Sequence, residues 1–317
     1  MKMGKVVRRL VGALSTALAL VSFFACSRYE SSAIDLVPSD SCAVVVVDWS
    51  TLRNDHDLKR LFNGDQFEAV LQRLAVDSSS VKSLVVFSAV NTQVKAGMLL
   101  RGSFDKQKQI ATLKTRGWRE ESVDGHKVYV NGNDYAAMPQ SNILFAGTRE
   151  AAAAVFRALG NSRERFSSSS SYKKISDGMT SRNKPIKAFL VMPQGTLDMA
   201  DAALEATSVA LSLFDLGGVG ALLKQLNIAS GFGLNLGSGS NRMYPVEMCV
   251  LMRDEKAAAL VSGSLNLLKG FSTAASNSNR DEQARQALHN MSITRVREVL
   301  SIRMTVPQAV LMPPSTR

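Results

Sequence analysis

The N-terminus of this 317-residue chain carries four Lys and Arg residues, followed by an uncharged apolar run of 16 residues, 10–25, that ends at Cys26. This is the pattern of a secretory signal, because the charges stay in the cytoplasm while the apolar run enters the translocon. A helix that spans a bilayer needs about 20 apolar residues, so the run is short for a permanent span. We therefore predict that residues 1–25 are a signal peptide and that the folded part follows them.

The residues around Cys26 resemble the lipobox of bacterial lipoproteins, in which a small residue, here Ala25, precedes an invariant Cys. Phe23 and Phe24 stand where the common pattern has Leu and a small residue. The resemblance implies diacylglyceryl transfer to the Cys26 thiol, cleavage before Cys26 and acylation of the new amino group. Such acyl chains, of the palmitate type, would hold the protein durably at a membrane. Cleavage by ordinary signal peptidase and an uncleaved anchor helix are the alternatives.

The predicted localisation is the bacterial cell envelope, facing the periplasm or the exterior. Ser27, which follows the Cys, resembles the outer-membrane sorting signal of bacteria with two membranes.

Composition is typical of a globular protein: 45% of the residues are apolar, 21% are charged, and the mean hydropathy is +0.01. The net charge of +11 is spread along the chain, with no basic helix or aromatic-basic strand. We therefore expect no nucleic-acid partner. Weak attraction to anionic lipid headgroups or cell-wall polymers is compatible with this charge.

Two cysteines, Cys42 and Cys249, remain if Cys26 is lipidated. An even number in an oxidising compartment allows a disulfide between them, and two separately buried thiols are the other arrangement. The sequence contains no Cys-x-x-Cys spacing, so neither a thioredoxin-like site nor a zinc ribbon is indicated.

Residues 42–49 form a β-branched run with no helical period, which indicates a buried strand. Asp124-Gly125 between two alternating segments is the strongest hairpin signal. Similar patterns predict further strands at residues 81–90, 95–104, 118–123, 126–130, 135–138, 142–146, 186–192, 228–236, 243–252 and 295–306. Helices are predicted between residues 50 and 74, split at Gly64, and at residues 105–116, where Asp105 is the expected cap, 150–159, 198–214, 221–226, 255–271 and 280–290. One or two helical turns are indicated at residues 171–179, within an otherwise polar connection.

A similar order of strands and helices occurs twice, which predicts an α+β fold with two halves. Each half resembles a ferredoxin-like (split βαβ) unit, with helices on one face of an antiparallel sheet. The predicted organisation is a signal peptide at residues 1–25, a polar tether at 26–38, a first half at 39–160, a Ser-rich linker at 161–185 and a second half at 186–317. Short segments, residues 36–41 and 145–148, resemble uncharacterised exported proteins of environmental bacteria, and this resemblance implies no activity.

No combination of residues indicates a catalytic centre, a metal site or a cofactor. The histidines, His56, His126 and His289, lack metal-ligand spacing. The glycines at 231, 233 and 237 fall in a predicted strand without the helix that a phosphate cradle needs. Asp48 ends a buried strand, where a helix cap is the simplest role for it.

The leading interpretation is a non-enzymatic binding or assembly module with an envelope protein or lipid as its partner. A lipid or lipoprotein carrier would need a continuous apolar cavity. A hydrolase acting on envelope material would need a pocket where at least two of His126, Asp48, Asp134 and Glu247 converge.

Overall fold

The computed structural model describes part of the chain, all but Ser32 within the compact unit Ala33–Arg317. The described ranges are 32–55, 58–59, 64–89, 95–180, 184–191, 229–241, 243–272 and 290–307. Cys26, the predicted signal peptide, His56, His289, the helices predicted at 198–214 and 221–226, and all but the last residue of the helix predicted at 280–290 lie outside them. None of the helices in these ranges is both long and apolar enough to cross a bilayer.

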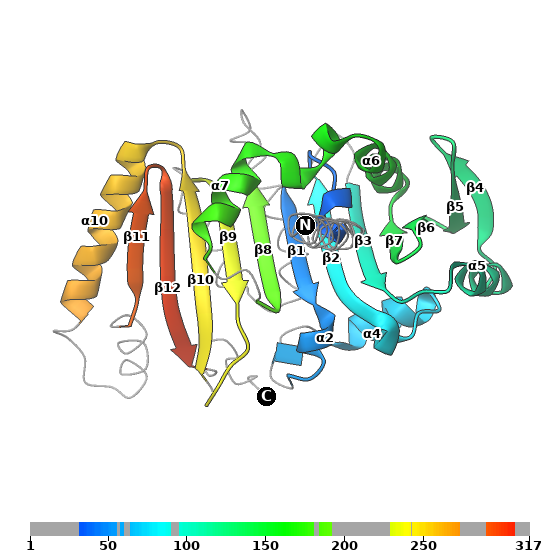
Figure 1. The fold of residues 1–317 in the computed structure, drawn as a ribbon, viewed down its shortest axis with the longest axis horizontal. Helices are drawn as coiled ribbons and strands as arrows, with labels where there is room; N and C mark the ends of the chain where they lie inside the picture. The colour runs from blue at the N-terminus through cyan, green and yellow to red at the C-terminus, as the bar shows by residue number, and fades with distance from the viewer. Residues whose placement is uncertain are drawn as a thin grey trace, which may run out of the picture. The chain divides into compact units, whose positions relative to one another are not determined.

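The described strands form one twelve-stranded sheet (Figure 1) in the order β11-β12-β10-β9-β8-β1-β2-β3-β7-β6-β5-β4. Every neighbouring pair in it is antiparallel, so the predicted α+β class with an antiparallel sheet is confirmed. The strands are β1 Ala43–Asp48, β2 Val81–Ala89, β3 Lys95–Gly102, β4 Arg119–Val123, β5 His126–Asn131, β6 Asp134–Gln140, β7 Ile143–Gly147, β8 Ile186–Val191, β9 Ala229–Leu236, β10 Met243–Met252, β11 Ser292–Val296 and β12 Val299–Pro307.

The two halves of the chain occupy the two halves of this sheet and meet where β1 pairs with β8. In each half a three-stranded meander (β1-β2-β3 or β8-β9-β10) is followed by a helix, and the last strand returns beside the meander. The strand order differs from the predicted split βαβ unit. Helical residues lie between β1 and β2 in the chain, yet these strands are direct antiparallel neighbours, whereas the two outer strands of a βαβ unit run parallel.

Helices cover both faces of the sheet, not one as predicted. One face packs against α2 Trp49–Leu52, α4 Gly64–Arg73, α5 Lys106–Thr115 and α10 Glu255–Ser272. The other packs against the 3₁₀ turn η1 Ala33–Leu36 and the helices α6 Arg149–Gly160 and α7 Ser170–Gly178. In β1, Val45 and Val47 belong to the first core and Val44 to the second. This two-sided burial explains the continuous apolar run, since alternate side chains of a strand point to opposite faces.

Two segments predicted to be polar connections are folded. Residues 33–37, placed in the tether by the sequence, include buried Ile34, Leu36 and Val37 in the core beneath α6. Most of the predicted linker forms the 3₁₀ turns η3 Ser162–Glu164 and η4 Phe166–Ser168 and the helix α7, which confirms the helical turns indicated at residues 171–179. Phe166 and Ile175 anchor this segment, and both are fully buried.

The final strand predicted at residues 295–306 is confirmed from Val299 onward as β12, but it is not continuous, because residues 295–296 belong to β11 and the chain turns between the two strands. Arg297 lies in the turn with a φ of 53°. Turns with a left-handed backbone are usually recognised in a sequence by Gly or Asn, and Arg at this position gives no such indication.

Candidate binding site

A row of polar side chains crosses the second half of the sheet. Strand register places Ser292, Arg303, Glu247, Asn235 and Lys187 directly opposite one another on β11, β12, β10, β9 and β8. Directly paired residues lie on the same face of a sheet, so these five share one face. We call them the polar row.

The line of directly paired positions continues into the first half of the sheet, but the residues there are apolar. Val46 pairs with Lys187, and Val85, Leu99 and Phe145 follow on the next strands. Val85, Leu99 and Phe145 are buried in the core that includes residues of α6. The polar character is therefore specific to the second half.

Glu247 is the centre of the polar row and is only 5% exposed. Its Oε1 accepts hydrogen bonds from Arg303 Nε (2.9 Å) and from the backbone N–H and hydroxyl of Thr180 (2.9 Å each). Asn235 Nδ2 donates to Oε2 at 3.3 Å. A buried carboxylate is costly unless it is paired and hydrogen-bonded, and these contacts meet that need.

Helix α7 covers the same face of the sheet beside the polar row (Figure 1). Its Ile175 side chain lies so close to Gly233 of β9 that a Cβ built there would be 2.4 Å from Ile175 Cγ2. Glycines at 231 and 233 thus let the helix approach the strand. Thr180 lies just after α7, so its hydrogen bonds to Glu247 hold the end of this helix against the sheet.

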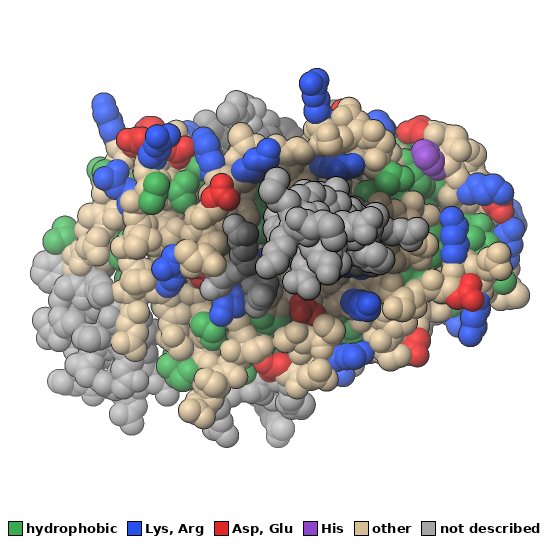
Figure 2. Space-filling view, in the orientation of Figure 1, with side chains coloured by type: hydrophobic (Ala, Val, Ile, Leu, Met, Phe, Trp, Pro, Cys, Tyr) green, Lys and Arg blue, Asp and Glu red, His purple; other side chains and the backbone are tan. Residues whose placement is uncertain are grey.

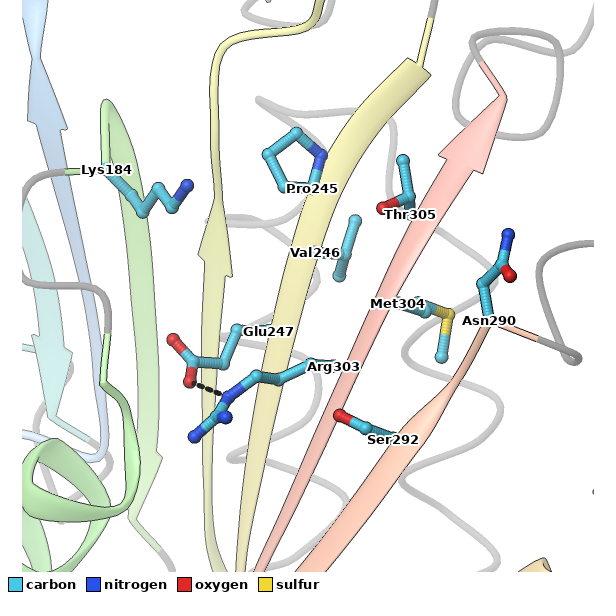
Figure 3. A pocket seen from close by; sticks show the side chains of 9 residues that line it. All are labelled: Lys184, Pro245, Val246, Glu247, Asn290, Ser292, Arg303, Met304 and Thr305. Atoms are coloured by element: carbon cyan, nitrogen blue, oxygen red, sulfur yellow. Dashed lines mark hydrogen bonds and ion pairs between the residues drawn. The ribbon is translucent and has the colours of Figure 1, made fainter.

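A pocket of about 190 Å³ opens at the polar row (Figure 3), and Glu247 and Arg303 extend toward one another there from neighbouring strands. Its lining residues are Lys184, Pro245, Val246, Glu247, Asn290, Ser292, Arg303, Met304 and Thr305. Three neutral polar side chains, two cations and one carboxylate thus surround it together with Pro245, whereas the side chains of Val246 and Met304 pack in the core on the opposite face of the sheet. Such a mixture suits a ligand that is small and polar on at least one side.

Lys and Arg side chains elsewhere on this face are scattered and interspersed with acidic ones (Figure 2). The described residues contain no cluster of three or more His, Cys, Asp or Glu placed to hold a metal ion.

The four residues considered for catalysis lie at separate places. Glu247 on β10 is separated from Asp48 on β1 by β9 and β8, and Asp134 forms an ion pair with Arg73 at the far end of the sheet. His126, also in that region, stacks on Phe156 at a ring separation of 4.2 Å. The four therefore do not converge on one pocket.

Asp48 has the simpler role considered for it, since it caps α2. Its carboxylate accepts from Ser50 Oγ at 2.6 Å and from Thr51 N–H at 3.1 Å. Burial would raise the pKa of Asp48, but the hydrogen bonds from Ser50 and Thr51 together outweigh it and leave the pKa below its usual value.

Cys42 and Cys249 are free, buried thiols, so the disulfide considered between them does not form in this structure. They belong to different cores, and β8 and β9 separate their strands. Three strand spacings amount to about 14 Å, well beyond the 7 Å that a disulfide bridges. Burial raises the pKa of Cys249 to about 12, which keeps its thiol protonated.

The sequence pointed to Glu247 as a candidate but missed Arg303, Asn235 and Thr180. Single polar residues inside otherwise apolar strands were the available signal, as in the buried stretch around Asn235. The sequence alone could not show that three strands and the end of a helix bring these residues together.

Comparison with known proteins identifies a fold but no family. No family model and no curated protein matches the chain. Crystal form III of TP0453 is similar, with a TM-score of 0.50 at 10% identity over 89% of this chain and 96% of that chain. Crystal forms I and IV of the same protein give TM-scores of 0.49 at 10% identity, covering 89% and 88% of this chain and 95% and 94% of theirs. At this identity the likeness to form III shows a shared fold alone.

Proposed function

We propose that this protein is a lipid-anchored protein of the bacterial cell envelope that acts as a non-enzymatic binding or assembly module. The observation that carries the binding role is the pocket beside the polar row, where a buried Glu247 holds Arg303 at the surface. Keeping a carboxylate buried in a sheet costs stability that an apolar residue of similar size would not cost. A binding role gives a reason for this cost. In this proposal the second half carries the site and the first half supports it.

The anchor is supported by the basic segment, the short apolar run and the small residue before Cys26. We expect the protein isolated from membranes of its host to have the intact mass of a chain that begins at an acylated Cys26. A Cys26→Ala variant is expected to accumulate as the unprocessed precursor without acyl mass. Mass spectrometry of both proteins checks this, and a Cys26→Ala protein processed to the same start would contradict lipidation.

The binding role is tested by a photoreactive residue, p-benzoylphenylalanine, placed at Ser292 in the full chain and expressed in the host. Ser292 is exposed and lines the pocket. The matched control is Ser122, an exposed serine on β4, the edge strand at the other end of the sheet. On irradiation we expect a discrete cross-linked product from position 292, reduced by Arg303→Gln, and none from position 122. Equal products at both positions, or none at 292, would rule out a partner at this pocket.

A further inference from the structure

Arg303 is positioned to receive an anion. Its Nε donates to the buried Glu247 carboxylate at 2.9 Å, which fixes the orientation of the guanidinium plane. Within the described part of the chain, its two terminal nitrogens have no hydrogen-bond or ion-pair partner, and the side chain is 42% exposed. A guanidinium held by one edge presents its remaining N–H groups in a fixed arrangement that matches the two oxygens of an oxyanion.

Lys184 supplies a second positive charge to the same pocket. Its Nζ lies beside Gly237 and Pro245, where a Cβ built on Gly237 would be 2.8 Å from it. Lys184 forms no ion pair with any residue that the structure describes. Figure 3 shows its amine reaching toward Pro245 from the segment that precedes β8.

The charges of the described residues that line the pocket favour a monoanion. Among them Lys184 and Arg303 contribute two positive charges and Glu247 one negative charge, which leaves one positive charge for a ligand to balance. A dianion would overcompensate that charge and would be repelled by the buried Glu247 carboxylate. A planar carboxylate also offers two oxygens to the terminal nitrogens of Arg303.

We infer that this pocket binds a small organic monocarboxylate, an inference that rests on the proposed binding function and names its ligand class. The carboxylate lies against the terminal nitrogens of Arg303, and Lys184 attracts it from the Pro245 end of the pocket, where the body of the ligand lies. The volume of about 190 Å³ accommodates several water-sized groups and therefore an acid of a few carbon atoms. Ser292 and Thr305 add hydroxyl groups that hydrogen-bond a polar substituent.

The test uses the full chain in a neutral detergent, titrated with butyrate, its neutral isostere butyramide and inorganic phosphate, followed by isothermal calorimetry at low salt. We expect one saturable butyrate site and at least tenfold weaker binding of butyramide and phosphate. Lys184→Gln is expected to weaken butyrate binding about tenfold, because one of the two positive charges that line the pocket is lost. Lys82→Gln, which removes an exposed lysine of β2 outside the pocket, is the matched control and is expected to bind as the wild type does.

Equal affinity for butyrate and butyramide, tighter binding of phosphate, or equal affinities of Lys184→Gln and Lys82→Gln would overturn the inference. The cross-linking experiment separates this failure from that of the proposed function. If butyrate does not bind but position 292 still yields its specific product, the ligand class is wrong and the binding role stands. If both fail, the pocket is not a binding site.

Discussion

Glu247→Ala is expected to lower the free energy of unfolding by about 3 kcal/mol, since hydrogen bonds to a charged group are worth about 1.5–3 kcal/mol each and are not additive. The variant removes the acceptor for Arg303, Asn235 and Thr180 at once. Asn235 is 1% exposed and cannot turn to solvent, whereas Arg303 is partly exposed and can be rehydrated. The expected loss is therefore smaller than the sum of the individual bonds. Urea unfolding followed by circular dichroism measures it.

The matched control for this prediction is Glu298→Ala. Glu298 lies in the turn between β11 and β12 and pairs with Lys174 Nζ at 2.9 Å, where the Lys174 and Glu298 side chains are 52% and 21% exposed, against 6% for the Glu247 side chain. Exposed ion pairs contribute about 0–1 kcal/mol, so this variant is expected to lose less than 1 kcal/mol. Equal losses for the two variants would contradict a structural role for the Glu247 network.

Gly233→Val is expected to destabilise the protein by about 2–3 kcal/mol, the range found when extra atoms are forced into a packed core. The new Cβ would stand 2.4 Å from Ile175 Cγ2 and 3.1 Å from Met179 Sδ, so α7 must move away from the sheet. Strand propensity favours Val over Gly and predicts the opposite sign. Thermal unfolding of the variant thus decides between packing and propensity.

A double variant shows whether the cost comes from contact with α7. Ile175→Ala alone leaves a cavity, but in combination with Gly233→Val it makes room for the new side chain. We expect the double variant to lose less stability than the sum of the two single losses. If the two losses of stability are additive, the Val side chain destabilises the protein through contacts other than those with α7.

Local features of the fold were predictable because they depend on neighbours in sequence. The hairpin at Asp124-Gly125 has both residues at positive φ, as its turn type requires, and Asp105 caps α5 as expected. The strand order was not predictable, because it depends on which edges meet after the chain has folded back. The turn at Arg297 was not predictable either, because an Arg side chain does not indicate the left-handed backbone that the turn requires.

In the candidate site, too, the individual residue was predictable from the sequence but its partners were not. Glu247 stands out in sequence as a lone carboxylate in an apolar strand, but its partners come from β9, β12 and the end of α7. Only the register of these elements brings the partners together. Within the serine-rich residues 161–185 the sequence indicated one or two helical turns at 171–179, and α7 lies there. It did not show that this helix packs on the sheet, because its buried contacts depend on a few residues such as Ile175.

The pairing of β1 with β8 has a consequence for how the protein is made. β1 is the first of the described strands to emerge, which under the proposed export is from the translocon, and β2 soon covers one of its edges. Its other edge stays open until Ile186–Val191 has been synthesised, because β8 is the strand that closes it. During that interval a valine-rich strand exposes unpaired backbone groups, the condition under which strands of different chains join. One edge of β1 therefore stays open until the second half begins to emerge, and the emerging chain depends on that half, or on a chaperone, to stay soluble.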